Sequence, residues 1–314
     1  MNRSNTSSIS RGLRRIRKEA PKKTLRAREV TVLVLTTAFL LSTVAVSGVA
    51  DVAEAQDDPF ESRFPCVVVE DPPPDPHVEN LDTNEQFTEI QSAVDAANPG
   101  DTIVVRQFDG VYDESVTVGK KNLVIDTEGR PVMDGGGGLG NAFDIQADGV
   151  VVNCFEIKGY TQSGIRATSD DNALGNSFIH SNAQDAEGIK LKSSSGNVVV
   201  ANELRQNKIG VLLEKSDDNE VEKNLANNND DFGIHLEPDA NDNNITNNTA
   251  ENNGIMGVCL VSSSRNEIDG NELKNNGKNG VVLSSSSGEN TVINNDILEN
   301  GQNGVWVSSG TGNE

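Results

Sequence analysis

Residues 188–213 read GIKLKSSSGNVVVANELRQNKIGVLL and contain one whole repeat together with the start of the next. The repeat opens on a glycine, which is followed by a β-branched residue, any residue and an apolar residue. The same opening recurs along the chain at intervals of 22 to 24 residues. The glycines concerned are Gly164, Gly188, Gly210, Gly233, Gly257, Gly280 and Gly304. Self-similarity at a fixed period of this length predicts a solenoid.

Within each repeat, short apolar stretches are separated by residues that favour turns. Val198-Val199-Val200 is typical of a β-strand, and Ser193–Asn197 before it is typical of a turn. A leucine-rich repeat has a similar period, but it needs several leucines per unit and usually a helix opposite the strand. Segments such as Asn227–Asp231 are poor helix formers. The sequence therefore predicts an all-β, right-handed parallel β-helix with coils of 22–26 residues.

Asparagine recurs in step with the glycines. One register contains Asn153, Asn176, Asn202, Asn224, Asn248, Asn271 and Asn295. A second follows five or six residues later, at Asn182, Asn207, Asn229, Asn253, Asn276 and Asn300. Asparagine tolerates the left-handed backbone of turns, and stacked amides can bond to one another along an axis. We therefore expect structural asparagine ladders and assign these residues no catalytic role.

The N-terminal 56 residues have the order of an export signal. Ten basic residues precede an apolar run over 30–50, and Ala53-Glu54-Ala55 is a small-x-small cleavage site. The apolar run is also long enough to span a bilayer, so an uncleaved anchor is the alternative. Residues 57–86 are acidic and rich in proline, as expected for a linker. We expect an exported protein, extracellular or on the cell surface, that contacts a membrane only through this N-terminal segment.

A cap and the first coils are expected over 87–139, and regular repeats over 140–314. Phe87, Ile90, Val94 and Ala97 fall on one face of a short helix, which Pro99-Gly100-Asp101 would end. Such a helix would cover the open end of the first coil, where strand groups are otherwise unpaired. The last three residues begin another repeat, so we expect the coils to continue past residue 314 or to stack on a partner.

The charge balance excludes some classes of partner. The chain carries a formal net charge of −22, and residues 1–56 hold ten of its 26 basic and four of its 48 acidic residues. The remainder therefore has 16 basic against 44 acidic residues, a net charge of −28. A body this acidic is a poor ligand for nucleic acid or an anionic membrane surface. It suits very salty surroundings, so a halophilic source is an expectation.

The cysteines give no sign of a disulfide framework. Cys66, Cys154 and Cys259 are odd in number, far apart and without a CxxC pair. Cys259 follows His235 by one repeat, and both are ligand types for copper or another soft metal. Acidic pairs such as Asp170-Asp171 are typical of calcium ligands. Because none of these is a full ligand set, we expect no bound cofactor.

The N-terminal part of the solenoid carries a family resemblance. FTEIQSAVDAANPGDTIVV at 87–105, followed by GVYDESVTVGKKNLVI at 110–125 and Asn- and Gly-rich coils, resembles the pectate-lyase-like superfamily. It is similar in style to the NosD repeat proteins and to carbohydrate-binding and sugar-hydrolase β-helix domains. The resemblance covers 87–314 and implies a parallel β-helix. For activity it implies either a polysaccharide ligand or, as for NosD, an accessory role in the maturation of a copper enzyme.

Alternation of side chains indicates which residues of the glycine-led strands face outward. If Ile165 and Ala167 point inward, Arg166 points outward and its equivalents stack along the axis. One outer column then reads Asp144, Arg166, Lys190, Leu212, His235, Cys259, Val282 and Trp306. The parallel column reads Gln146, Thr168, Lys192, Glu214, Glu237, Val261, Ser284 and Ser308.

The polar part of these columns is the candidate site. Bases beside carboxylates could hold an acidic sugar and abstract a proton, with Lys190 or His235 as the base and Arg166 on the carboxylate. The candidate catalytic residues are Arg166, Lys190, His235 and Glu237. The candidate substrate-binding residues are Lys192, Glu214 and Trp306. A solvated strand face with incidental ion pairs is the alternative. We expect a scaffold that binds polysaccharide, and the alternatives are a polyuronate lyase or C5-epimerase and a NosD-like accessory protein.

Overall fold

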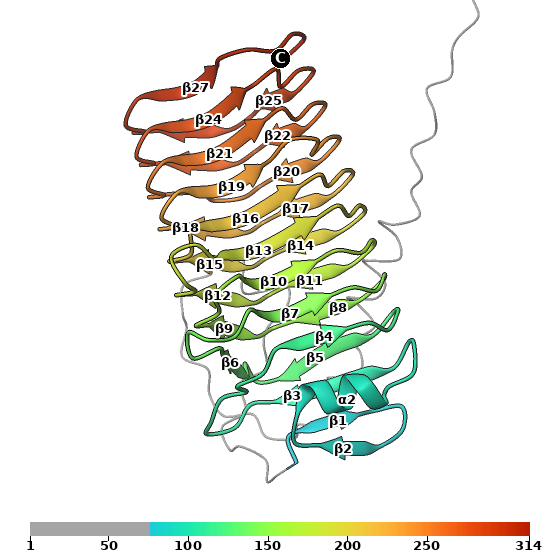
Figure 1. Cartoon of the computed structure of the whole chain (residues 1–314). Helices are drawn as coiled ribbons and strands as arrows, with labels where there is room; N and C mark the ends of the chain where they lie inside the picture. Colours follow the sequence, from blue (N-terminus) through green and yellow to red (C-terminus); the bar gives the residue numbers. More distant parts are fainter. Residues whose placement is uncertain (1–75) are drawn as a thin grey trace, which may run out of the picture.

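Strands that are one repeat apart in the sequence lie side by side and pair in parallel, so each turn of the chain stacks on the turn before it (Figure 1). The computed structural model describes residues 76–314. They form a right-handed parallel β-helix, as the repeat predicts. The basic segment, the expected export signal or anchor, and most of the expected linker lie outside the described residues. No helix within 76–314 has the length and apolar character needed to cross a membrane.

Sheet C holds the repeat glycines in its last seven strands and has nine strands in all. They are β4 (Val116–Val118), β7 (Asn141–Ile145), β10 (Ser163–Ala167), β13 (Glu187–Lys192), β16 (Ile209–Glu214), β19 (Phe232–Leu236), β21 (Met256–Val261), β24 (Asn279–Ser284) and β27 (Asn303–Val307). The glycines lie where the backbone of the next coil comes close. A Cβ on Gly188 would lie 2.7 Å from the carbonyl oxygen of Gly210, so no other residue fits there without movement.

Sheet A has eleven strands. They are β1 (Val78–Asn80), β2 (Glu85–Phe87), β3 (Thr102–Arg106), β5 (Val124–Glu128), β8 (Val151–Asn153), β11 (Ala173–Gly175), β14 (Val198–Val200), β17 (Glu220–Glu222), β20 (Asn244–Thr246), β22 (Glu267–Asp269) and β25 (Thr291–Ile293). All pairs are parallel except those of β1, which lies antiparallel between β2 and β3.

Sheet B completes each coil and is the least regular of the three. Its strands are β6 (Val132–Asp134), β9 (Glu156–Lys158), β12 (Phe178–His180), β15 (Glu203–Arg205), β18 (Leu225–Asn227), β23 (Glu272–Lys274) and β26 (Asp296–Leu298). Between β18 and β23 the ladder narrows to single bridges through Thr249.

The cap contains the expected helix, α2 (Ile90–Ala96), which buries Ile90, Ala93 and Val94. Glu114 accepts the first helical N–H groups: the amides of Ile90 and Gln91 each lie 2.9 Å from one of its carboxylate oxygens. Burial raises the pKa of Glu114 against the effect of these two bonds. Because the carboxylate comes from the loop before β4, it fastens the cap to the first coil.

The linker assignment was too long at its C-terminal end. Val78–Asn80 and Glu85–Phe87 are strands of sheet A, and Val78 and Asn80 are fully buried. The Asn80 side chain donates to Asp101 at 2.9 Å and accepts the backbone N–H of Asp82 at 2.9 Å. A segment that alternates buried residues in this way is part of the folded body, and its proximity to the prolines hid it in the sequence.

The core is a thin column of aliphatic side chains, as the scarcity of aromatic residues implies. One inward position of sheet C stacks as Ile165, Ile189, Val211, Ile234, Val258 and Val281, all fully buried. Tyr160, also fully buried, donates its hydroxyl to the backbone carbonyl of Glu114 at 2.7 Å. Each coil therefore adds a few apolar residues to a core that grows in one dimension only.

Asparagine ladders run along the coils, with one correction to the expected register. From Asn202 to Asn295, each Nδ2 donates to the Oδ1 of the asparagine one coil on, at 2.9–3.0 Å. Asn153 and Asn176 do not belong to this ladder, because Ser177 occupies the position before Asn202. They form a separate pair, in which Nδ2 of Asn176 lies 2.7 Å from Oδ1 of Asn153. Phe155 and Ser177 hold the ladder position in these two coils, and Asn153 and Asn176 lie two residues and one residue before it.

The second expected ladder, from Asn182 to Asn300, is confirmed. A third ladder was not predicted: Asn172, Asn197, Asn219, Asn243, Asn266, Asn290 and Asn313 also bond side chain to side chain. Its members follow the turns between sheets C and A.

The cysteines differ from the expectation that none is paired. Cys154 is disulfide-bonded, whereas Cys259 is free and buried. Sequence spacing could not show this, because spacing reports on local motifs and not on contacts between distant segments.

Candidate functional site

One predicted column of outward side chains on sheet C stacks in register throughout, and the parallel column is paired in part. Arg166 pairs with Asp144 on one side and with Lys190 on the other. Lys190 is followed by Leu212, then by His235, Cys259, Val282 and Trp306. The parallel column places Lys192 beside Glu214. Alternation and the repeat period thus predicted the correct neighbours along this column.

The first half of the face, over β7, β10 and β13, is charged and internally neutralised. Lys190 lies between two carboxylates, 3.7 Å from Glu187 and 3.2 Å from Glu214. Lys192 lies 2.8 Å from the other oxygen of Glu214. These two ammonium groups, Lys192 above all, lower the pKa of Glu214 and hold it ionised. The sequence analysis did not include Glu187, because this residue precedes the glycine that defined each repeat.

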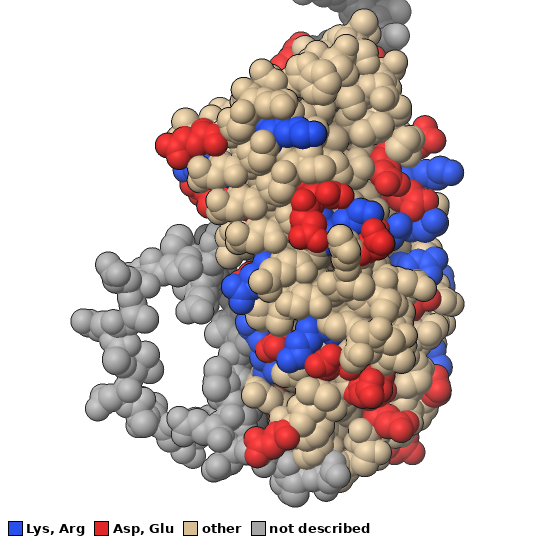
Figure 2. Space-filling view, turned by 60° about the vertical axis from the view of Figure 1, so that its left-hand side comes forward, with Lys and Arg blue, Asp and Glu red and all other residues tan. Residues whose placement is uncertain are grey.

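Arg166 is neutralised as well, since its Nη1 lies 3.4 Å from Oδ1 of Asp144. Gln146 donates to the other oxygen of the same carboxylate at 2.7 Å. Figure 2 shows the same mixture on the face it presents, where acidic and basic side chains form small groups with uncharged surface between them. The face is therefore polar and balanced in charge, without an excess of cations that would attract a polyanion.

The column that contains Arg166 and Lys190 turns apolar from β16 onward, with His235 as its one polar ring. Leu212, Cys259 and Val282 face outward and lie outside the interior core, yet each is at least 96% buried. The adjoining column also turns apolar here, because Ile209, Phe232 and Met256 succeed Glu187 along the coils. Trp306 is 46% exposed in the last coil. The change from charged to apolar occurs between β13 and β16.

His235 lies in this apolar half. Its ring packs on Phe232 with 4.6 Å between the centroids, and neither ring nitrogen has a hydrogen-bond partner among the described residues. Burial lowers the pKa of His235 to about 4, so the imidazole is neutral at physiological pH. Burial also raises the pKa of the adjacent Cys259 thiol to about 12. Because its surroundings do not stabilise the thiolate, this thiol is a poor nucleophile.

The four candidate catalytic residues thus lie along one face of the solenoid, but they do not come together in one site. Arg166 and Lys190 lie on neighbouring coils, whereas His235 is two coils beyond Lys190, about 10 Å away at the usual strand spacing. Glu237 directly follows β19 and hydrogen-bonds through its backbone N–H to Leu213. An acid and a base that act on one sugar need to reach the same atoms. The arrangement does not offer that for Lys190 and His235.

Sheet B carries a further polar cluster that the glycine-based pattern missed. The ring of Phe178 stacks on His180 with centroids 4.0 Å apart, and the guanidinium of Arg205 lies 4.4 Å from the Phe178 centroid. Nε2 of His180 is 3.3 Å from Glu156. The signal in the sequence was the third strand of each coil, where Lys158, His180 and Arg205 occupy equivalent positions.

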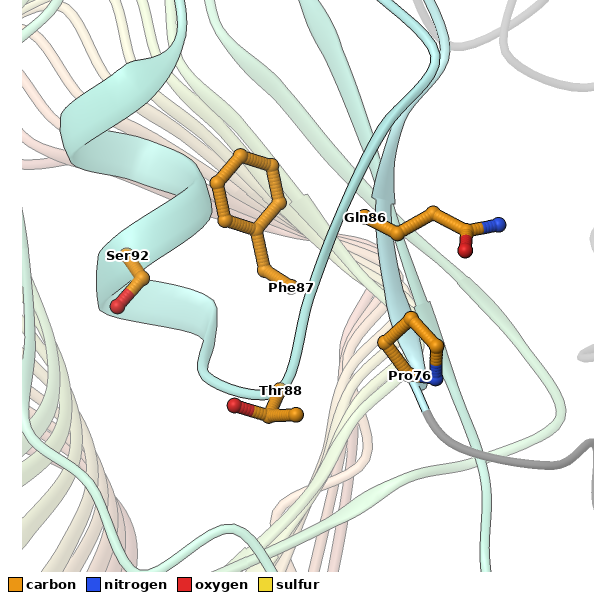
Figure 3. A pocket seen from close by; sticks show the side chains of 5 residues that line it. All are labelled: Pro76, Gln86, Phe87, Thr88 and Ser92. Carbon is orange, nitrogen blue, oxygen red and sulfur yellow. The ribbon is translucent and has the colours of Figure 1, made fainter.

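An open pocket lies beside the cap, lined by Pro76, Gln86, Phe87, Thr88 and Ser92 (Figure 3). The Phe87 ring points toward α2, and Gln86 points away from it on the other side of the strand. All five side chains are uncharged, so this pocket offers no acid–base pair. Within residues 76–314, no group of three or more His, Cys, Asp or Glu side chains is arranged to hold a metal ion.

Residues 100–314 match the family model described as NosD, periplasmic copper-binding protein. The chain belongs to the NosD family. The match covers more than half of the sequence and agrees with the stacked coils described above. No curated protein matches the sequence significantly.

Solved structures confirm the fold of this NosD-family chain. Pectate lyase Pel9A superposes with a TM-score of 0.57 at 17% identity, over 72% of each chain. The enzymatically active domain of tailspike protein 2 from bacteriophage CBA120 gives a TM-score of 0.54 at 15% identity. That match covers 71% of the NosD-family chain and 40% of the tailspike. At these identities the likeness shows a shared parallel β-helix.

Proposed function

We propose that the chain is an exported, surface-located β-helix scaffold that binds a polysaccharide along the outer face of sheet C. The observation that carries this proposal is the in-register stacking of one outward column from Asp144 to Trp306, with Lys192 beside Glu214 in the parallel column. A polymer can lie along the charged part of this face, over β7, β10 and β13, and meet polar side chains at a coil spacing of about 4.8 Å. The proteins with similar structures include a pectate lyase and a phage tailspike, which supports a glycan ligand.

The charge balance of the face favours an uncharged polysaccharide. Lys190, Lys192 and Arg166 each contact a carboxylate, so an acidic polymer would have to displace an existing ion pair. The hydrogen-bonding groups of Gln146 and Thr168 lie beside them and suit sugar hydroxyls. Outside the N-terminal segment the chain is also strongly acidic, and this repels polyanions over longer distances.

Trp306 allows this proposal to be tested directly, because it is the single tryptophan of the chain. A glycan array would select ligands, and each would then be titrated while the fluorescence of Trp306 is recorded. We expect neutral glycans to bind and to shift the emission, and Lys192→Ala to weaken binding. The matched control is Lys274→Ala, since Lys274 is also ion-paired but lies on sheet B. Binding confined to uronate polymers, or equal effects of both variants, would contradict the proposal.

Lyase or C5-epimerase activity on uronate polymers is the enzymatic alternative. It would need Lys190 or His235 to act as a base near Arg166. Lys190 is ion-paired with Glu187 and Glu214, and the His235 ring packs on Phe232. An ultraviolet assay for unsaturated uronate products across several polymers distinguishes the two: product formation would replace the scaffold proposal by a lyase.

A second candidate function is an accessory role in the maturation of a copper enzyme. The family description, periplasmic copper-binding protein, favours it. The residues fit copper in one place only among those described, where His235 and Cys259 pair on β19 and β21 in apolar surroundings. The test is the copper content of a co-expressed copper enzyme with and without this chain. Equal copper loading in both cases would discard the accessory role.

A further inference from the structure

Three side chains with nitrogen or sulfur lone pairs occupy neighbouring positions on β19 and β21. His235 pairs in register with Cys259 on the next coil, and Phe232 pairs with Met256. The Phe232 ring lies 4.6 Å from the His235 ring, which shows that side chains of these two adjoining columns touch. Met256 and Cys259 occupy the same two positions one coil on. The pairing therefore places an imidazole, a thioether and a thiol on neighbouring positions of two coils.

The His235 ring has no polar function in the fold. Both of its nitrogens are inaccessible to solvent and lack a hydrogen-bond partner within residues 76–314. Buried polar groups are nearly always hydrogen-bonded, so an exception calls for an explanation such as an unoccupied ligand role. His180 provides the contrast, because its two ring nitrogens contact Ser181 and Glu156.

The surroundings select for a soft ion. Leu212 before His235 and Val282 after Cys259 offer no side-chain oxygen, and the amide oxygen of Asn279, which follows Met256, already accepts two hydrogen bonds from Asn303. Thiolate and thioether sulfur favour Cu(I), whereas carboxylates and carbonyls favour calcium or magnesium. An ion of charge +1 bound to one thiolate would also leave the site neutral overall, which suits its apolar setting.

We propose that His235, Met256 and Cys259 bind one Cu(I) ion on the outer face of sheet C. The inference deepens the second candidate function and rests on it only for the identity of the ion. On binding, the Cys259 S–H bond breaks, the S–Cu bond forms and the proton leaves to solvent. His235 and Met256 donate lone pairs, and copper keeps its oxidation state, so no oxidant or reductant is required.

Silver(I) is the first probe, because it mimics Cu(I) without a reductant and so leaves the Cys154 disulfide intact. Calorimetric titration of the full chain with Ag(I) should give one tight site, with one proton released per ion. Cu(I) in competition with a chromophoric chelator, without oxygen, should give the same stoichiometry. Zn(II) and Ca(II) should not compete.

Cys259→Ser and Met256→Leu should each weaken Ag(I) binding at least tenfold, and His235→Leu should do the same. His180→Gln is the matched control and should leave the affinity unchanged. Circular dichroism and the thermal midpoint of each variant show whether it is folded. If Cys259→Ser does not fold, Met256→Leu still tests the site, because this substitution conserves the side-chain volume. Unchanged affinity in folded Cys259→Ser or Met256→Leu would overturn the site. If the site binds the ion but the copper loading of a co-expressed enzyme is the same with and without this chain, only the accessory role is removed.

Discussion

Asn224 donates two hydrogen bonds to a single atom of Asn248, although 24 residues separate them in the chain. Its backbone nitrogen lies 2.9 Å and its Nδ2 3.0 Å from Oδ1 of Asn248. Asn248 repeats the arrangement with Asn271, and its Nδ2 also lies 2.8 Å from the carbonyl oxygen of Val221. Each asparagine thus joins three coils, and it satisfies backbone groups that the strands leave unpaired at the corner.

Replacing Asn248 by Ala should destabilise the protein strongly. The change leaves two buried donors of Asn224 and the acceptor on Val221 without their partner, and each such group costs about 1–3 kcal/mol. We expect a loss of about 3 kcal/mol, measured as a shift of the urea unfolding transition. Asn244→Ala is the control, since Asn244 lies on the outer face of β20, and its effect should stay within about 0.5 kcal/mol. Similar losses for both variants would refute the structural role of the ladder.

Gly280→Ala should also destabilise the solenoid, because the new methyl group has no room. Its Cβ would lie 2.3 Å from Cγ2 of Ile297 and 2.7 Å from the carbonyl oxygen of Gly304. Overpacking of this kind costs about 1–3 kcal/mol. Gly119→Ala is the matched control, as no atom lies within 4 Å of its added Cβ. Thermal midpoints of the two variants test this, and an equally stable Gly280→Ala would argue against the close stacking of the glycine column.

Glu214→Gln should convert the charged half of sheet C into an anion-binding surface. The variant frees Lys190 and Lys192 from the carboxylate that both contact. We expect affinity for an acidic polysaccharide to rise several-fold at low salt and the gain to disappear near 1 M salt, where screening acts within about 3 Å. Glu237→Gln, on the next coil, is the control, because it also removes one negative charge but breaks no ion pair with a lysine. A gain of equal size in both variants would show that only net charge matters.

Acid should weaken the cap through Asp101. The Asn80 side chain, followed by the N–H of Asn98, holds the pKa of this buried carboxyl below its usual value. A lowered folded-state pKa stabilises the protein above the unfolded-state value near 4, and that stabilisation is lost as pH falls through the folded-state value. Wild type should therefore exceed Asp101→Asn in stability by about 1 kcal/mol at pH 7 and lose that advantage at pH 2. Urea transitions at the two pH values measure the difference, and a constant gap would contradict the assignment.

Much of the fold was readable from the sequence, because in-register parallel pairing turns a period along the chain into a column in space. The glycine period placed Arg166 beside Lys190 and His235 beside Cys259 without any structural information. The same reasoning failed for Asn153 and Asn176, because Phe155 and Ser177 hold the ladder position in their coils.

The candidate site was less accessible to sequence reasoning, because its chemistry depends on contacts that cross columns. Glu187 lies outside the repeat motif, yet it helps to neutralise Lys190. The outward columns gave no warning that Leu212 and Cys259 are buried, since alternation reports direction and not accessibility. Phe178 and His180 were overlooked because sheet B has no glycine to mark its strands.

The asparagine ladders have a polarity, and it bears on how the molecule is built. Between successive asparagines of the ladder, the backbone N–H and the side-chain amide of the earlier residue donate to the side-chain oxygen of the later one. The ribosome synthesises the N-terminal coils first, so each folded coil can serve as a template and offers hydrogen-bond donors to the coil that follows. Assembly can then advance like a zipper, with contacts that span about one period of chain rather than its whole length. Synthesis and hydrogen-bond direction run the same way.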